Sequence, residues 1–423
     1  MRISHVGWNL AGLAFPLLIA VVTVPALIGR LGHERFGLLA LAWGLIGYAG
    51  ALDLGIGRAL TQKVSRLRGD GNLSAVPNVL VTAERITLIA GLAGGALIAL
   101  AGLFGAETWV GAATTPRTEI TIAIFLLAIA LPAQAMSATY RGLNEAFLNF
   151  KGINLLRVGL GAVNFGGPYL VSLYTVELPW LVATLVASRL MALAVFRWLA
   201  HACIDDWRSV KVGAAYSSAA AKSLFSFGGW VTVSSVVSPM LVQADRFLIA
   251  SMLSATAVTA YVVPYEVVVQ SLILVGAVSS VLFPMLSRLM REEPNGWQRY
   301  FHRWLVRVAG MMLLACVAIA LLLPDVLKLW LENDLQPESI LVGQILCLGV
   351  FANAIGSMYF ALLHAKGRAD LTAKLHIVEL PLFVTALVFL LHQYGLPGAA
   401  WAWVGRMVLD AAALAWTSRS LHA

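Results

Sequence analysis

Six arginines carry the clearest chemical signal in this sequence, because each lies within a long apolar stretch. They are Arg58, Arg85, Arg157, Arg189, Arg246 and Arg406. A cation near the centre of a bilayer costs roughly 2.5 to 3.5 kcal/mol, so such residues are usually paired or face an aqueous cavity. The planar guanidinium also matches the geometry of phosphate. These arginines therefore predict either internal ion pairs or a site for an anion.

Depth along the expected helices separates these arginines. Arg58 and Arg157 lie within about 8 Å of one end of their helices, and Arg246 is about as near to the other end, so all three side chains can extend to the interface. Arg85 lies deeper, and Arg189 is close to the middle of its stretch.

Acidic residues in the same stretches are the natural partners of these cations. Arg406 is followed one helical turn later by Asp410, which predicts a structural pair. Five further carboxylates are candidates for lining a cavity or for binding a coupling ion: Asp53, Asp245, Glu266, Glu84 and Glu379. Each can neutralise a neighbouring arginine or can titrate, because desolvation disfavours a charged carboxylate.

Membrane-spanning helices are the elements that must position these residues. Of the 423 residues, 60% are hydrophobic and only 12% are charged. Apolar runs of about 20 residues fit helices, whereas a β-barrel needs alternating segments of about ten residues. The predicted fold class is an all-α polytopic membrane protein with about twelve spans, at residues 9–28, 36–59, 78–104, 119–140, 152–174, 178–199, 226–250, 257–286, 304–323, 339–363, 372–391 and 397–417.

Positive charge predicts the orientation of these helices. Most Lys and Arg residues outside the spans, Arg141 included, fall in the loops of one side, which the positive-inside rule assigns to the cytoplasm together with both termini. The net charge of +8 therefore reflects topology. No nucleic-acid partner is expected, because no soluble basic domain is present.

Motifs for catalysis or cofactor binding are absent from the sequence. It contains no Walker A, His-Glu-x-x-His or Gly-x-Ser-x-Gly pattern. The loops opposite the cytoplasmic side are too short to assemble a catalytic domain. Cys203, Cys316 and Cys347 show neither disulfide nor metal-ligand spacing. We therefore expect no enzyme activity, no cofactor and no metal site.

An internal repeat divides the chain into two halves. A shift of 222 residues aligns Ser4, Gly7 and Trp8 with Ser226, Gly229 and Trp230. Six spans per half predict parallel bundles related by a pseudo-two-fold axis along the membrane normal, with a site between them. The predicted domains are an N-terminal bundle over residues 1–200, a basic cytoplasmic linker over 201–222 and a C-terminal bundle over 223–423. In the first bundle, Gly91-x-x-x-Gly95 predicts close helix contact.

Short motifs in both halves resemble one family of membrane proteins. The motifs are Leu31-Gly32-His33-Glu34-Arg35-Phe36-Gly37-Leu38, Leu52-Asp53-Leu54-Gly55-Ile56-Gly57, Asp245-Arg246-Phe247-Leu248-Ile249, Ala260-Tyr261 and Leu282-Phe283-Pro284-Met285-Leu286-Ser287. They resemble the O-antigen and polysaccharide-repeat flippases, which belong to the superfamily of multidrug (MATE-type) and lipid II exporters. The likeness is strongest in spans one, two, seven and eight.

The resemblance implies a MATE-like fold, a function and a set of site residues. The implied cargo is an undecaprenyl-diphosphate-linked oligosaccharide, moved from the cytoplasmic to the periplasmic leaflet of a bacterial inner membrane by alternating access. Membrane lipid, H+ or Na+, and the polysaccharide polymerase and chain-length machinery are implied as partners. Because the family's cavity is lined by helices one, two, seven and eight, Arg58 and Arg246 are the first candidates for contacting the headgroup, ahead of Arg85 and Arg189.

Two alternatives from the same superfamily stay open at this stage. One is a cation-coupled multidrug exporter, for which a cavity rich in carboxylates and aromatic residues would be expected. The other is a lipid II flippase, a branch that usually has fourteen spans. A membrane-embedded enzyme or a scaffold for glycan assembly is a further reading from a different class.

Overall fold

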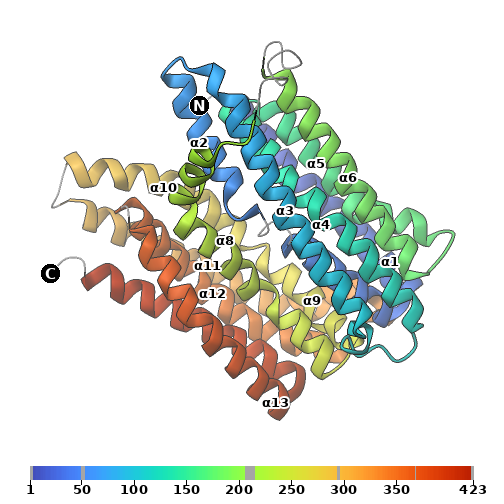
Figure 1. Cartoon of the computed structure of the whole chain (residues 1–423). Coiled ribbons are helices and arrows are strands. Elements are labelled where there is room, and N and C mark those ends of the chain that lie inside the picture. The colour runs from blue at the N-terminus through green and yellow to red at the C-terminus, as the bar shows by residue number, and fades with distance from the viewer. Residues whose placement is uncertain (1–2, 49–52, 205–214, 293–295, 367, 421–423) are drawn as a thin grey trace. The chain divides into compact units, whose positions relative to one another are not determined.

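A computed structural model describes residues 3–48, 53–204, 215–292, 296–366 and 368–420, which contain helices and no strands (Figure 1). The chain divides into two compact units, Met1–Pro239 and Met240–Ala423. Their boundary falls inside one helix, α8, at Ser218–Met252. The predicted domain limits stay a prediction, and residues 205–214 of the expected linker lie outside the described residues.

Each predicted span overlaps a helix of the structure. Unit 1 contains α1 (Ile3–Tyr48), α2 (Ile56–Gly69), α3 (Val76–Leu103), α4 (Arg117–Ala146), α5 (Phe150–Ser172) and α6 (Leu178–Ala202), with short 3₁₀ turns at Leu73–Ala75 and Ala106–Thr108. Unit 2 contains α9 (Ala255–Val269), α10 (Leu272–Glu292), α11 (Trp297–Leu331), α12 (Pro337–Ala365) and α13 (Ala369–Ser420), with a 3₁₀ turn at Glu332–Asp334.

Length and surface chemistry identify a multi-pass membrane protein. Within the described ranges, seven helices are long and apolar enough to cross a bilayer. Leucines cover their outer surfaces; Leu314 and Leu321 of α11, for example, are 74% and 72% exposed. Such surface is stable against lipid and would be unstable in water. The predicted all-α polytopic fold is therefore confirmed.

The second predicted span is not continuous. The helix that follows a bend at Gly32 (φ 72°) ends at Tyr48, and α2 begins only at Ile56. Between them, Leu54 and Gly55 have positive φ values of 52° and 70°, which end a right-handed helix. Asp53 stabilises this turn, because its Oδ1 accepts a hydrogen bond from the Gly55 N–H at 2.8 Å.

The eighth predicted span is broken in a similar way, since α9 ends at Val269 and α10 begins at Leu272. A shift of 222 residues would carry the turn at Leu54 and Gly55 to residues 276 and 277, which lie inside α10, so the two breaks are not at equivalent positions of the repeat. The eleventh and twelfth spans form the single element α13, which bends at Gly395 (φ 61°).

One helix lies at the centre of each unit. In unit 1, α4 contacts α1, α2, α3, α5 and α6; in unit 2, α12 contacts α9, α10, α11 and α13. The predicted glycine contact is confirmed on α4: a Cβ at Gly91 would lie 2.6 Å from Pro132 Cα, and one at Gly95 would lie 2.6 Å from the Ala128 carbonyl oxygen. Only glycine allows α3 to approach α4 this closely.

The three cysteines are free thiols, as expected. Cys316 and Cys347 are buried, and Cys203 is half-buried. The Cys203 Sγ lies 3.8 Å from Asn144 Oδ1 and 4.0 Å from Asn149 Nδ2. Asn149 also caps α5 by accepting a hydrogen bond from the Gly152 N–H at 3.3 Å.

Candidate functional site

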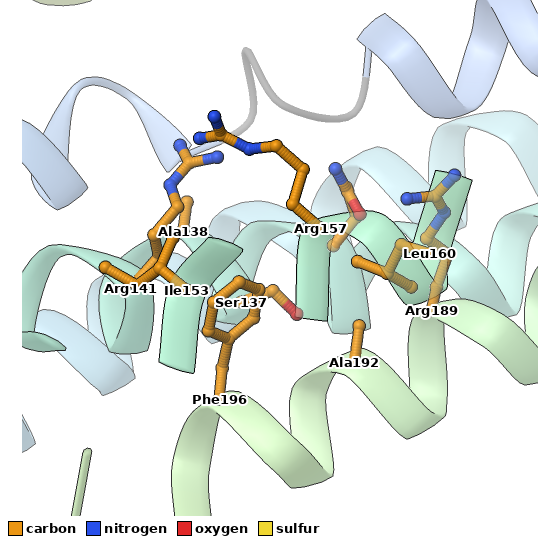
Figure 2. A pocket seen from close by; sticks show the side chains of 10 residues that line it. Ser137, Ala138, Arg141, Ile153, Arg157, Leu160, Arg189, Ala192 and Phe196 are labelled. Atoms are coloured by element: carbon orange, nitrogen blue, oxygen red, sulfur yellow. The ribbon is translucent and has the colours of Figure 1, made fainter. Parts of the chain in front are cut away.

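Three arginines line one cavity of unit 1. The cavity has a volume of about 140 Å³ and lies among α4, α5 and α6 (Figure 2). Arg141 projects from α4, Arg157 from α5 and Arg189 from α6; the other lining residues are Gln134, Ser137, Ala138, Ile153, Leu160, Ala192 and Phe196. Figure 2 shows the side chains of Arg141, Arg157 and Arg189 together with the helices that carry them. We refer to this space as the arginine cavity.

The charged residues that line the arginine cavity, within the described part of the chain, are all cations. No carboxylate is among its described lining residues. Arg141 and Arg157 are exposed, and the nearest acidic contact of Arg141 is a long one, 3.7 Å from its Nε to Glu145 Oε1. Guanidinium groups form strong paired hydrogen bonds with phosphate and carboxylate. The cavity therefore suits an anionic group.

Arg189 is held in place by neutral partners only. Its Nη2 donates to Asn164 Oδ1 at 3.0 Å, and its Nε has no hydrogen-bond partner. The Asn164 carbonyl oxygen in turn accepts a hydrogen bond from Trp43 Nε1 at 3.1 Å. The charge of Arg189 is thus oriented by this network but is not neutralised by it.

The chain positions these arginines through simple helix geometry. Arg141 lies five residues before the end of α4, and Arg157 lies seven residues after the start of α5. Consecutive antiparallel helices bring residues at similar distances from their connection to the same level. The helix α6 contacts both neighbours, whereas α4 and α5 contact each other little, which leaves the space that Arg189 enters.

Arg58 lies beside this cluster and not within it. A Cβ added to Gly57 would lie 2.8 Å from the Ala138 carbonyl oxygen, so glycine lets α2 lie directly on α4. This contact brings the buried Asp53 close enough to both Arg58 and Arg141 for electrostatic interaction. Arg58 itself is exposed. Its predicted contact with substrate stays a prediction.

Arg85 and Glu84 are neighbours on α3 but have different surroundings. Arg85 is exposed, with its guanidinium 5.9 Å from the centre of the Tyr216 ring. Glu84 lies beside the hydroxyl of the buried Tyr140. Neither residue lines the arginine cavity.

Arg246 is already paired within unit 2. Its Nη2 lies 2.6 Å from Glu266 Oε1, and its guanidinium lies 5.3 Å from the centre of the Tyr265 ring. The neighbouring Asp245 is fully buried and accepts a hydrogen bond from the Tyr261 hydroxyl at 2.8 Å. This network pairs the Arg246 guanidinium with a carboxylate, although its Nε has no hydrogen-bond partner. Its predicted contact with substrate stays a prediction.

The predicted pair of Arg406 with Asp410 is wrong. Arg406 Nη1 instead donates to the Leu241 carbonyl oxygen at 2.8 Å, and its guanidinium lies over the Phe383 ring. This acceptor lies on α8, so the spacing along α13 could not reveal it. Asp410 lies instead beside His376, with 3.9 Å between Oδ1 and Nε2.

Glu34 organises one end of unit 1, in a connection outside the predicted spans. Its carboxylate accepts hydrogen bonds from the backbone N–H groups of Ala113, Thr114 and Thr115 at 2.7 to 3.1 Å, and from two threonine hydroxyls. Burial alone would raise the pKa of Glu34, but these hydrogen bonds outweigh it and lower the pKa to about 2. Next to it, Arg35 forms an ion pair of 2.8 Å with Glu119, whose other oxygen accepts from the Leu178 N–H.

Comparison with known proteins assigns the chain to a family. Residues 4–290 match the family model described as "Polysaccharide biosynthesis protein". The chain belongs to the polysaccharide biosynthesis protein family. This matched region contains the whole arginine cavity and the Arg246 network, but neither Glu379 nor Asp410.

Relatives of this family member are known from sequence and from structure. It is 30% identical over 413 residues to the "Putative O-antigen transporter" of Shigella flexneri, covering 97% of this chain and 96% of the relative. It is 22% identical to the lipopolysaccharide biosynthesis protein WzxC of Escherichia coli (strain K12), covering 91% and 74% of the two chains. Among solved structures, the chain is similar to the inward-facing conformation of a multidrug resistance MATE family transporter of the MOP superfamily. The TM-score is 0.79 at 14% sequence identity, and the match covers 97% of each chain. This similarity confirms the MATE-like fold.

Two residues of the arginine cavity were missed in this family member by sequence reasoning. Arg141 was assigned to a loop by the charge rule, and Arg157 was assigned to the interface because it lies near a helix end. The signal that could have found them is their similar distance from the α4–α5 connection. Of the predicted site residues, only Arg189 lines the cavity.

Proposed function

We propose that this protein is a flippase that moves an undecaprenyl-diphosphate-linked oligosaccharide from the cytoplasmic to the periplasmic leaflet of a bacterial inner membrane. The observation that carries the proposal is the arginine cavity, which has three guanidinium side chains and no carboxylate among its described lining residues, in a member of the polysaccharide biosynthesis protein family. The name of the Shigella flexneri relative supports the same cargo.

The chemistry of the cargo explains why the cations are needed. A diphosphate that leaves bulk water requires counter-charges and hydrogen-bond donors. Arg141, Arg157 and Arg189 supply both, while the polyprenyl chain remains in membrane lipid. Alternating access would let the headgroup cross in contact with protein and water.

The setting of the protein follows from this function. Both termini lie in the cytoplasm, and a proton or a sodium ion drives the cycle. The protein performs no covalent chemistry and hands its cargo to the polysaccharide polymerase and chain-length machinery on the periplasmic side.

The composition of the cavity also separates this proposal from a multidrug exporter. An exporter of cationic drugs would repel its cargo from three arginines, since no carboxylate lines the space. A lipid II flippase shares the diphosphate chemistry, so it differs from the proposal only in the sugar that is carried.

Complementation of a deletion strain tests the proposal. Deletion of the gene should abolish a surface polysaccharide and should cause its lipid-linked unit to accumulate inside the cell. The native gene should restore the polysaccharide, whereas Arg157→Ala combined with Arg189→Ala should not, because two of the three counter-charges are lost. Arg117→Ala removes an exposed arginine at the start of α4 and should complement fully.

Protein levels measured in the same membranes exclude a folding defect as the cause. Arg157→Lys with Arg189→Lys keeps the charge and should restore part of the transport, because lysine lacks the paired donors of arginine. Normal polysaccharide in the deletion strain, with sensitivity to cationic drugs, would contradict the proposal and would favour a multidrug exporter.

A further inference from the structure

A cluster of ionisable side chains in unit 2 has no role in the arginine cavity. His376 and Glu379 lie three residues apart on the first segment of α13, and Asp410 lies on the segment that follows the Gly395 bend. One ligand atom of each residue lies within 4.8 Å of the other two. The bend therefore brings together groups that are more than thirty residues apart in the sequence.

Glu379 is the least satisfied member of this cluster. It is 7% exposed, and neither of its carboxylate oxygens has a hydrogen-bond partner. It faces the Asp410 carboxyl, whose Oδ1 is also without a hydrogen-bond partner. Two ionised carboxylates at this distance repel each other strongly in a buried site, and one shared proton removes the repulsion.

The charges of the surrounding helices do not cancel this pair. Among the described residues, the cation that acts electrostatically on Glu379 is Arg406 of α13, whose Nη1 is already bound to the Leu241 carbonyl of α8. Arg406 also interacts electrostatically with Asp245 of α8. If Glu379 and Asp410 are both ionised and His376 is neutral, the positive charge of Arg406 balances only one of the two carboxylates. The group then carries a net charge of one negative unit.

Two histidines lead from this pair toward the end of the helices. His376 lies one turn before Glu379, at 16% side-chain exposure and 3.9 Å from Asp410. His376 is close enough to His364 for electrostatic interaction. His364 lies in the last turn of α12, and its Nε2 is 3.4 Å from the Oγ1 of Thr372. Glu379 lies ten residues, or about 15 Å, from the start of α13. A carboxyl pair at this depth with imidazoles along the way to the helix end is a suitable arrangement for moving a proton.

We propose that Glu379 and Asp410 share one exchangeable proton and that His376 passes it toward His364 and the α12–α13 connection. The proton leaves the carboxyl pair for the His376 imidazole and then passes to His364 or to water, and no electrons change hands. The idea that this proton drives the movement of cargo rests on the proposed flippase function. The existence of the proton site itself is argued only from the geometry of unit 2.

A proton fits this site better than a metal ion does. The cluster needs one positive charge, so a divalent ion would leave an excess charge in a buried place. Hard monovalent ions such as sodium prefer a shell of oxygen ligands, and here one of the three groups is an imidazole.

Infrared difference spectroscopy of the purified full-length protein tests the site without any cargo. Titration with acid should produce the C=O band of a buried protonated carboxyl. Glu379→Gln and Asp410→Asn should each remove this band, and His376→Asn should slow its appearance after a pH jump. Asp370→Asn changes a carboxylate on the same helix that is bound to Arg368, and it should leave the band intact.

Transport in proteoliposomes then connects the site to function. A pH gradient should accelerate movement of a lipid-linked oligosaccharide by the native protein. Glu379→Gln should reduce this rate to the one measured without a gradient, and its thermal unfolding should show that the isosteric variant is folded. A carboxyl band that persists in both Glu379→Gln and Asp410→Asn, or acceleration by sodium alone, would overturn the proton site. A normal titrating band without movement of any lipid-linked oligosaccharide would instead contradict the flippase function.

Discussion

At the scale of single residues, burial and pairing separate structural charges from available ones. Arg246 was a leading candidate from sequence because the resemblance placed it on a cavity helix, yet its guanidinium is bound to Glu266. Depth separated Arg189, close to mid-span, from Arg157 near a helix end, yet both line the arginine cavity. The surroundings of these arginines depend on side chains of other helices, which are not visible in the spacing along one helix.

The Glu34 carboxylate provides a prediction about stability. Because its pKa is lowered to about 2, its contribution should be fully present above pH 4.5 and should be lost as the pH falls from there toward 2. Glu34→Gln should lower the free energy of unfolding at pH 7 by an amount on the order of 1 kcal/mol, since solvent screens so accessible a group. Thermal unfolding of the native protein and the variant should converge in acid; a difference that persists at pH 2 would contradict the assignment.

The same residue explains one of the sequence motifs. Glu34 and Arg35 lie in the segment Leu31 to Leu38 that resembles the flippase family, and both tie helix connections together. Asp53 and Tyr261, from two other motifs, also make internal hydrogen bonds. These four residues of the resembling motifs therefore help to build the fold.

At the scale of elements, the α3–α4 contact depends on glycine. Gly95→Ala places a methyl group against the Ala128 carbonyl, and we expect a loss of about 1 to 3 kcal/mol in the free energy of unfolding, with a lower unfolding temperature in detergent. Gly159→Ala in α5 is the matched control, because no atom lies within 4 Å of its added Cβ. Equal unfolding temperatures of the two variants would show that the contact is looser than described.

Hydropathy predicted the positions of the helices but not their interruptions. The second and eighth spans were predicted as single helices, although the polar residues Asp53 and Gln270 lie at the two turns. These turns depend on local backbone conformation and, at Asp53, on a side-chain hydrogen bond. The cavity was beyond prediction for a related reason, since it arises where α4 and α5 diverge along α6.

At the scale of the whole molecule, the repeat and the orientation stay predictions, while the MATE-like fold is confirmed. Central helices α4 and α12 recur about 220 residues apart, close to the shift of the repeat. Orientation rests on loop charge, which is a property of the chain as a whole and independent of packing.

Cysteine labelling measures this orientation directly. In a Cys203→Ser background the remaining thiols are buried. A membrane-impermeant maleimide added to intact spheroplasts should label Thr118→Cys, near the start of α4, and should spare Ser74→Cys, which lies between α2 and α3. Labelling after lysis serves as the control for accessibility. The opposite pattern would place both termini outside the cytoplasm.

The unbroken course of α8 across the boundary of the two units has a consequence for genetic dissection. Any cut between Ser218 and Met252 severs hydrogen-bonded helix. A cut just before Ser218 preserves the helix but transfers Ala220 and Leu224, which pack into the core of unit 1, to the second fragment. Two such fragments, expressed from separate genes, would each be incomplete alone. They would regain a native core only by assembling through α8. The two halves of the chain are therefore not interchangeable modules.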